Sequence, residues 1–322
     1  MNSVLKGGAT LLLAGASALV LAQSYPAKPV RLVVAFAAGG GTDVLARNLA
    51  NTLKDTLGQA LVIDNRPGAG TIIGTEAAAK AAPDGYTLLV SLDQSLTMNQ
   101  WLYDKLPYDP LKDFAPISLL ANSSRLYVSN PKAPGPTLRA LMDYAKANPG
   151  KLNYSTAGIG TPPHLAVELL AAATGIQTVH VPYKGAPQSE GAALTGEVSF
   201  TFTQPIVINM ARAGKARILG VSSNKRTALM PDVPTIAEAG VPGFEVLAWY
   251  GMLAPAKTPP EIVTRLNSEM LQALKQKDVT DRLQTLGFEP PAPHTPADFL
   301  AYMRSESAKW QKVVKDANIK AE

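Results

Sequence analysis

The chain has 322 residues, 46% of them hydrophobic and 17% charged, so it is long enough for two ordinary domains with packed cores. Its formal net charge is +5, and its basic residues are scattered among acidic ones, which argues against nucleic-acid binding. The sequence contains no cysteine, which excludes disulfides, thiolate catalysis and attachment of a lipid to a cysteine.

The N-terminal segment, residues 1–22, has the pattern of a secretory signal peptide. Lys6 precedes an apolar stretch from Ala9 to Leu21, and the chain becomes polar after Ala22. The stretch is too short for a comfortable membrane span, and it lacks the polar face of a buried first helix, which is the alternative interpretation. The sequence therefore predicts a soluble periplasmic protein, whose mildly basic mature chain attracts small anions weakly.

From Pro29 onward, short β-rich runs alternate with helical stretches, which is typical of a parallel sheet covered by helices. The first half contains predicted strands at 30–36, 61–64 and 86–92, and a predicted helix at 72–81. Between the first two strands, leucines recur at every fourth position, as the buried face of one helix requires: Leu45, Leu49, Leu53 and Leu57.

The second half repeats this order. Residues 117–128 form an extended run that crosses toward a second unit, and residues 246–255 form a run that returns from it. Between the crossings we predict strands and helices in alternation: strands at 152–156, 178–183, 198–203 and 217–222, and helices at 163–173 and 188–194. Two predicted helices with apolar stripes follow the second crossing, and the second of them starts at Thr295 and Pro296.

The predicted architecture is therefore two discontinuous α/β lobes joined by two crossing strands. Residues 23–122 and 248–322 form the first lobe, because two crossings return the chain to where it began. Residues 123–247 form the second lobe. This arrangement leaves a hinged cleft, and clefts between domains are where small ligands bind.

Glycine-rich turns connect strand to helix in both lobes. Residues 36–43 precede the leucine-faced helix, residues 155–162 occupy the same place in the second lobe, and residues 66–71 form a third turn. Glycine permits close approach of a ligand to the backbone, and unpaired amides at a helix N-terminus favour an anion. Each turn alone is also explained as a tight connection, but two turns that face each other would clamp a dicarboxylate.

The sequence motifs that mark cofactor-binding and metal sites do not occur here with the residue spacing that those sites require. Val44 and Pro163 stand where a dinucleotide-binding fingerprint needs a small residue, and no phosphate loop is present. The histidines, His164, His180 and His294, are far apart and have no second metal ligand at the required spacing. The sequence therefore predicts neither a cofactor nor a metal site.

Four residues can be interpreted either as structural or as functional. Ser222 and Lys225 match a short serine–lysine hydrolase element whose companion motifs are missing, so an exported hydrolase is the less favoured alternative. Asp43 is more typical of a helix cap or turn-stabiliser than of a catalytic acid. His164, near the start of its predicted helix, is either a pocket wall or a packed histidine.

An ordered set of motifs resembles the tripartite tricarboxylate transporter receptors, the Bug family of periplasmic solute-binding proteins. The resemblance covers the whole mature chain. Its motifs are Phe36-x-x-Gly39-Gly40-x-x-Asp43-x-x-Ala46-Arg47, Asn65-Arg66-Pro67-Gly68-Ala69-Gly70 with Gly74, Pro83-Asp84-Gly85-Tyr86, Leu106-Pro107-Tyr108-Asp109, Gly158-x-Gly160-Thr161 with His164-Leu165, Val181-Pro182-Tyr183-Lys184-Gly185, and Pro231-Asp232-Val233-Pro234-Thr235 through Pro242-Gly243-Phe244.

The resemblance implies an α/β fold like the type II periplasmic-binding proteins and a role in binding rather than catalysis. It implies that the ligand is a di- or tricarboxylate, an acidic amino acid or an aromatic acid, held mainly by backbone amides and ordered water. It also implies delivery to the membrane components of a transporter, with a sensor that presents the closed form to a signalling receptor as the alternative. We expect a monomer without cofactor.

The predicted ligand-binding residues come from the glycine-rich turns and neighbouring strand ends. They are Phe36, Ala38, Gly39, Gly40, Thr42, Asp43, Ala69, Gly70, Asp93, Ser155, Gly158, Gly160, Thr161, His164, Lys184 and Gln204. Two departures from the family pattern bear on the ligand. Residues 71–73 are more apolar than is usual there, which favours a less polar ligand. Asp93 stands where small hydroxyl residues are common, so it either brings a carboxylate toward an amine or hydroxyl of the ligand or faces away from the cleft.

Overall fold

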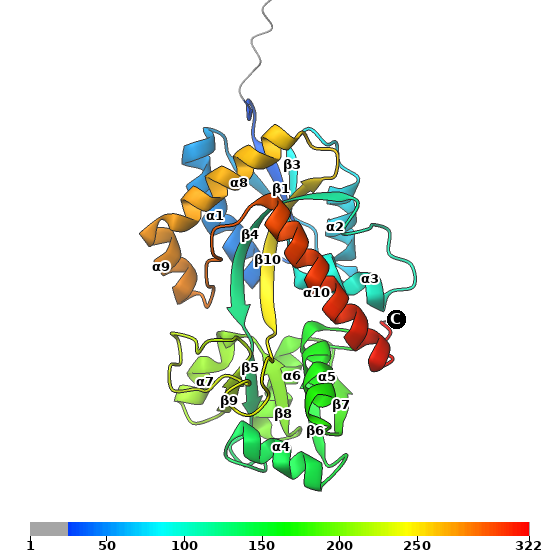
Figure 1. The fold of residues 1–322 in the computed structure, drawn as a ribbon. Helices are drawn as coiled ribbons and strands as arrows, with labels where there is room; N and C mark the ends of the chain where they lie inside the picture. The colour runs from blue at the N-terminus through cyan, green and yellow to red at the C-terminus, as the bar shows by residue number, and fades with distance from the viewer. Residues whose placement is uncertain (1–24, 322) are drawn as a thin grey trace, which may run out of the picture.

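Two lobes joined by two strands make up the computed structural model, which describes residues 25–321 (Figure 1). Each lobe contains a mixed five-stranded sheet, with strand orders β2-β1-β3-β10-β4 and β7-β6-β8-β5-β9. The predicted signal peptide, residues 1–22, lies outside the described residues. None of the helices in the described range is long and apolar enough to span a membrane.

The sheet of the first lobe combines parallel strands from the N-terminal part of the chain with one strand that returns from the second lobe. Its strands are β1 (Val30–Val34), β2 (Leu61–Asn65), β3 (Thr87–Leu92), β4 (Phe114–Ser124) and β10 (Leu247–Pro255). Strands β1, β2 and β3 are parallel, and β10 is antiparallel to both β3 and β4. The near-continuous apolar run of β1 is what a strand covered on both faces requires, and Leu32 and Val33 are fully buried.

Helices cover both faces of this sheet. They are α1 (Gly41–Leu57), η1 (Ala69–Thr71), α2 (Ile72–Ala79), the π-helical turn η2 (Gln94–Met98), α3 (Asn99–Leu102), α8 (Pro260–Lys275) and α9 (Lys277–Thr285). The four leucines of α1 are at most 5% exposed, so the predicted buried stripe is confirmed. Gly58 ends α1 in a left-handed conformation, with φ of 70°.

The second lobe has the same construction on a smaller scale. Its strands are β5 (Leu126–Ser129), β6 (Leu152–Thr156), β7 (Thr178–Pro182), β8 (Phe200–Thr203) and β9 (Arg217–Val221). Its helices are α4 (Leu138–Ala147), α5 (Pro162–Thr174), α6 (Ala186–Thr195), η3 (Pro205–Val207) and α7 (Ile208–Arg212). Phe200 stacks between Tyr127 and Tyr154, with ring centroids 4.6 and 5.5 Å away, and these buried rings form the centre of the core.

The two crossings meet at Ser222, which follows β9. The backbone N–H of Arg125, the residue between β4 and β5, donates to Ser222 Oγ at 2.8 Å, and Ser222 N–H donates to Arg125 O at 3.0 Å. On its other side, Ser222 O accepts from Val246 N–H at 3.0 Å, and Ser222 Oγ donates to Val246 O. Ser222 is fully buried, so its hydroxyl joins the crossing segments and is not exposed as a hydrolase nucleophile would be.

The C-terminal helix α10 (Pro296–Asp316) packs on both lobes (Figure 1). It begins with a capping box formed by Thr295 and Asp298, as the sequence predicts for a helix start there. Phe299 belongs to the core of the first lobe, whereas Trp310 packs among core residues of the second lobe and α10 contacts α5. The tail, which the sequence interpretation assigned to the first lobe alone, therefore also completes the core of the second.

Replacing Trp310 by alanine tests this bridging role. We expect the free energy of unfolding to fall by about 3–5 kcal/mol, because removal of a fully buried aromatic side chain leaves a cavity and forfeits apolar burial. Chemical denaturation followed by circular dichroism measures the loss. Tyr144→Ala on the surface of α4 is the control, with an expected loss within ~0.5 kcal/mol. A similarly small effect of Trp310→Ala would contradict the packing described.

Candidate functional site

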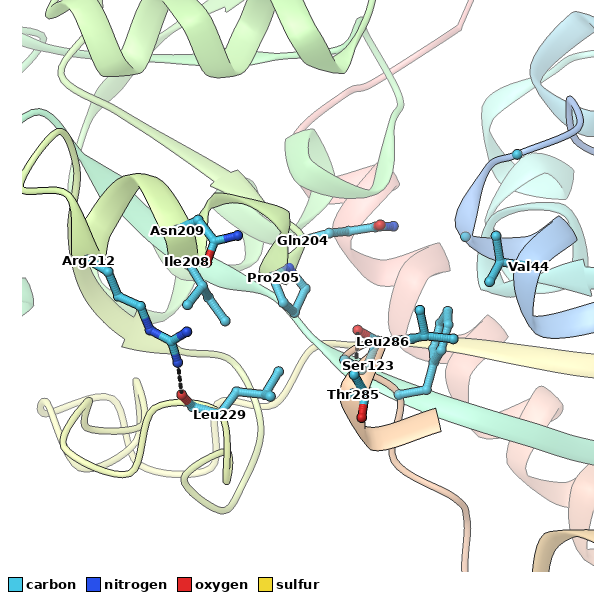
Figure 2. A pocket seen from close by; sticks show the side chains of 14 residues that line it. Val44, Ser123, Gln204, Pro205, Ile208, Asn209, Arg212, Leu229, Thr285 and Leu286 are labelled. Atoms are coloured by element: carbon cyan, nitrogen blue, oxygen red, sulfur yellow. Dashed lines mark hydrogen bonds between the residues drawn. The ribbon is translucent and has the colours of Figure 1, made fainter. Parts of the chain in front are cut away.

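A cavity of about 430 Å³ lies between the lobes (Figure 2). Its size falls in the range of ordinary small-molecule pockets. The first lobe supplies Gly39, Gly41, Val44, Ser123, Thr285, Leu286, Gly287 and Phe288, and the second lobe supplies Gln204, Pro205, Ile208, Asn209, Arg212 and Leu229. Arg212 is the one charged residue in this lining, and the lining contains no carboxylate. The cavity is therefore electrostatically suited to an anion.

The first glycine-rich turn is held in place by Asp43, which is 2% exposed. Its carboxylate accepts hydrogen bonds from Gly39 N–H at 2.8 Å, Arg47 Nε at 2.9 Å and Asn65 Nδ2 at 2.9 Å. Burial alone would raise the pKa of Asp43, but the hydrogen bonds and the charge of Arg47 outweigh it and lower the pKa to about 2. Asp43 is thus an ionised turn-stabiliser, and the N–H of Gly39 is already used within the loop.

Helix α1 presents its N-terminus to the cavity. Gly40 is the N-cap residue and no side chain caps the helix, so the first-turn amides that begin at Gly41 lack intrahelical acceptors. A Cβ atom on Gly41 would lie 3.9 Å from Tyr250 Oη and 4.0 Å from Gln204 Oε1. The glycine therefore brings the positive end of a 17-residue helix close to a polar side chain of the opposite lobe.

The neighbouring residues of the first turn differ in exposure. Phe36 is half-buried, Ala38 and Gly40 are exposed, and Thr42 is buried. The structure thus brings Gly39, Gly41 and Gln204 together at one cavity, with Gln204 pointing from the second lobe toward the start of α1, where Val44 lies (Figure 2).

The turn over residues 66–71 has a contorted backbone. Ala69, Gly70 and Thr71 are all left-handed, with φ of 45°, 58° and 79°. Asn99 Nδ2 donates to Gly70 O at 2.9 Å, and a Cβ atom on Gly70 would lie only 2.8 Å from Tyr103 Oη. The turn is held by the segment around α3 and does not line the 430 Å³ cavity.

The glycine-rich turn of the second lobe also lies off the cavity wall. The N–H of Gly160 donates to His164 Nδ1 at 3.0 Å, and Thr161 Oγ1 donates to Gly158 O at 2.7 Å. A Cβ atom on Gly160 would meet Leu102 of α3 at 3.1 Å. The amide expected to hold one end of an anion is thus bonded within the lobe, and the clamp formed by two glycine-rich turns stays a prediction.

His164 is a packed, neutral histidine in this structure. Its ring stacks on His180 with centroids 3.9 Å apart, and burial lowers the pKa of each ring to about 4. Whereas His164 Nδ1 accepts from Gly160, His164 Nε2 lies 3.9 Å from Glu168 Oε1. Among residues 25–321 no three His, Asp or Glu side chains gather in a group that could hold a metal ion.

Asp93 is fully buried and does not line the cavity. Its Oδ1 accepts from Gln94 N–H at 2.9 Å at the start of η2, whereas its Oδ2 has no hydrogen-bond partner. Arg125 Nη2 lies 4.0 Å from Oδ2. Burial raises the pKa of Asp93 to about 7, and the charge of Arg125 opposes this rise without cancelling it.

The remaining predicted site residues are separated from the cavity. Ser155 Oγ donates to Ser189 O at 2.7 Å in the interior of the second lobe. Lys184 is exposed, and its backbone N–H donates to Gln188 Oε1 at 3.3 Å.

Sequence reasoning missed most of the cavity wall. Asn209 and Arg212 lie on the short helix α7, and residues 286–288 form a turn after α9. No motif or periodicity marks these residues. The nearest signal is Gly287, whose left-handed φ of 82° indicates a tight turn close to Pro205 of the other lobe.

Comparison with known proteins places the chain among transporter receptors. The model of the tripartite tricarboxylate transporter family receptor matches residues 45–319. Protein BugT of Bordetella pertussis is 38% identical over 309 residues, which cover 95% of this chain and 94% of that protein.

Solved structures agree with this family. R. palustris Rpa4515 with adipate is 36% identical with a TM-score of 0.80, and covers 92% of this chain and 99% of that one. MatC from Rhodopseudomonas palustris with bound malate is 35% identical with a TM-score of 0.76, and covers 90% of this chain and 100% of that one. These similarities confirm the two-lobed periplasmic-binding fold predicted from the sequence.

The shifted pKa of Asp93 predicts a pH-dependent stability. Because the pKa in the folded state, about 7, exceeds the unfolded value near ~3.9, the folded protein loses stability as pH rises between these values. Asp93→Asn removes this loss. The free energy of unfolding of the variant relative to the wild type should therefore rise by a few kcal/mol from pH 4 to pH 8, at about 1.4 kcal/mol per unit of pKa shift. Urea denaturation at several pH values measures it.

Asp43→Asn provides the contrast, because the pKa of Asp43 is lowered to about 2. The stability contributed by this carboxylate is present above its unfolded pKa and is lost as pH falls toward 2, so the cost of Asp43→Asn should shrink in acid. A pH-independent difference for Asp93→Asn would contradict the raised pKa of this buried carboxyl.

Proposed function

Because the chain belongs to the tripartite tricarboxylate transporter receptor family, we propose that it is a periplasmic receptor that captures a small organic carboxylate between its lobes and delivers it to membrane components of such a transporter. The apolar segment before Ala22 supports export through a cleaved signal peptide. The related structures of Rpa4515 with adipate and of MatC with bound malate support a carboxylate ligand.

The observation that carries this proposal is the composition of the interlobe cavity. Gly41 supplies an uncapped helix N-terminus from one lobe, and Gln204 supplies an amide side chain from the other. Arg212 adds a positive charge, and no lining residue is acidic. A carboxylate needs such donors to replace its hydration, since an unpaired buried charge is costly.

Binding between the lobes couples capture to closure. A ligand that contacts Gly41 and Gln204 at once binds the closed form better than an open one, so it shifts the population toward closure. The lobes lie close together at a second point, because a Cβ atom on Gly287 would lie 3.3 Å from Pro205. Closure in turn gives the membrane partner a conformation that differs from that of the empty receptor.

The direct test is binding by the mature protein to a panel of mono-, di- and tricarboxylates, amino acids and aromatic acids. We expect stoichiometric binding by calorimetry without turnover, and a smaller radius of gyration by solution scattering when the right acid is added. Native mass spectrometry of the purified protein identifies any acid that is retained. Folded protein that binds no member of the panel would refute the proposal.

Gly41→Leu should block the site while preserving the helix. The added side chain would occupy the space between Gly41 and Gln204, and we expect affinity to fall at least ~100-fold, or about 3 kcal/mol. The matched control is Gly191→Leu on α6, where an added Cβ meets nothing within 4 Å. Unchanged affinity in Gly41→Leu would place the ligand elsewhere.

A further inference from the structure

The interlobe cavity has polar groups at two ends and mostly apolar side chains between them (Figure 2). Gln204 lies toward the end where helix α1 begins, since a Cβ atom on Gly41 would lie 4.0 Å from Gln204 Oε1, and Asn209 and Arg212 of α7 lie toward the other end. The polar groups at the first end come from α1 and from Gln204, and those at the other end come from α7. A ligand with one charged group would leave one of these ends without a partner.

Arg212 has little to bind within the protein. It is exposed, and its Nη2 donates to Leu229 O across 3.5 Å, the upper limit of a hydrogen bond (Figure 2). Over residues 25–321 it forms no ion pair, whereas Arg226, also in the second lobe, pairs with Glu238 at 2.9 Å. A guanidinium offers five N–H donors in a planar fork that matches a carboxylate. Arg212 therefore retains the capacity to bind an anion in the cavity.

The wall between the two ends is mostly apolar. It includes Pro205, Ile208, Leu229, Leu286 and Phe288. Its two hydroxyls, those of Ser123 and Thr285, already donate to Gly287 O and Asp281 O. The side chains of this wall therefore offer no free hydrogen-bond donor, and polar substituents on the middle of a ligand would lose hydration with little compensation.

Two contacts fix the turn that carries part of this wall. The Phe288 ring packs edge-on against Tyr250 with centroids 5.2 Å apart, and Ser123 Oγ donates to Gly287 O at 2.9 Å. The apolar wall is thus a defined surface and not a loose loop.

We infer that Arg212 is a second anion anchor and that the ligand is a dicarboxylate with an apolar body, either an aliphatic chain or an aromatic ring. One carboxylate binds at the Gly41 end and the other binds the Arg212 guanidinium, while the body lies along the apolar wall. This inference rests on the proposed function, because it requires that a carboxylate binds in this cavity. It restricts the ligand class to acids whose two charges are separated by an unsubstituted spacer.

The test compares acids that differ in one charge or in one hydroxyl. Adipate and terephthalate supply two carboxylates on an apolar body, their monomethyl esters remove one charge, and malate places a hydroxyl on a short diacid. The mature wild-type protein should bind at least one of the two apolar diacids, at least ~10-fold more tightly than its half-ester and more tightly than malate. Calorimetry at constant ionic strength measures these affinities.

Arg212→Gln should weaken binding of the preferred diacid by about 10–100-fold, because a hydrogen bond to a charged group contributes ~1.5–3 kcal/mol. Binding of the half-ester should change little, because the half-ester lacks the second carboxylate that Arg212 would bind. Lys146→Gln, on the surface of α4, makes the same change in net charge away from the cavity and should leave both affinities unchanged.

Each other outcome overturns the inference. Equal affinity for diacid and half-ester in the wild type would show that no second anchor exists. Equal losses for both acids in Arg212→Gln, or no loss, would remove Arg212 from that role. Preference for malate or for another acid of the wider panel would overturn the apolar-diacid class while leaving the proposed function intact. Only a protein that binds no carboxylate at all would refute the proposed function as well.

Discussion

The buried hydrogen bonds of Ser222 are the constraint on which the two-lobed structure depends. Ser222 joins Arg125 on the first crossing to Val246 beside the second, and all these polar groups lie where water cannot replace their partners. The junction fixes where each crossing strand enters and leaves a lobe. It thereby places the N-terminus of α1 and the side chain of Gln204 on opposite walls of one cavity.

The two sides of the molecule differ in how the lobes meet. On one side, Trp310 of α10 and Leu102 of α3 pack with the core of the second lobe, so that contact is apolar and extensive. On the other side lies the cavity, with polar groups and a turn around Gly287. Relative motion of the lobes costs least where little apolar area is exposed, so opening is easier on the cavity side than on the side of α10.

Elements with strong periodicity could be predicted from the sequence, and residues defined by tertiary contacts could not. The leucine stripe of α1 repeats at the spacing of a helix, and β1 is a short apolar run rich in valine, so both elements could be predicted. The π-helical turn at Gln94–Met98 has no such period. Gly160 looked like an anion donor, but whether its N–H is free depends on His164, whose position follows from the fold. Arg212 stands out only once its neighbours are known.

The long helix α10 also constrains how the chain folds as it is made. The core of the first lobe requires β10, and the core of the second requires Trp310, Val313 and Val314 near the C-terminus. Synthesis proceeds from the N-terminus, so neither core can be completed until almost the whole chain has emerged. The nascent protein therefore remains incompletely packed up to the last steps of its synthesis.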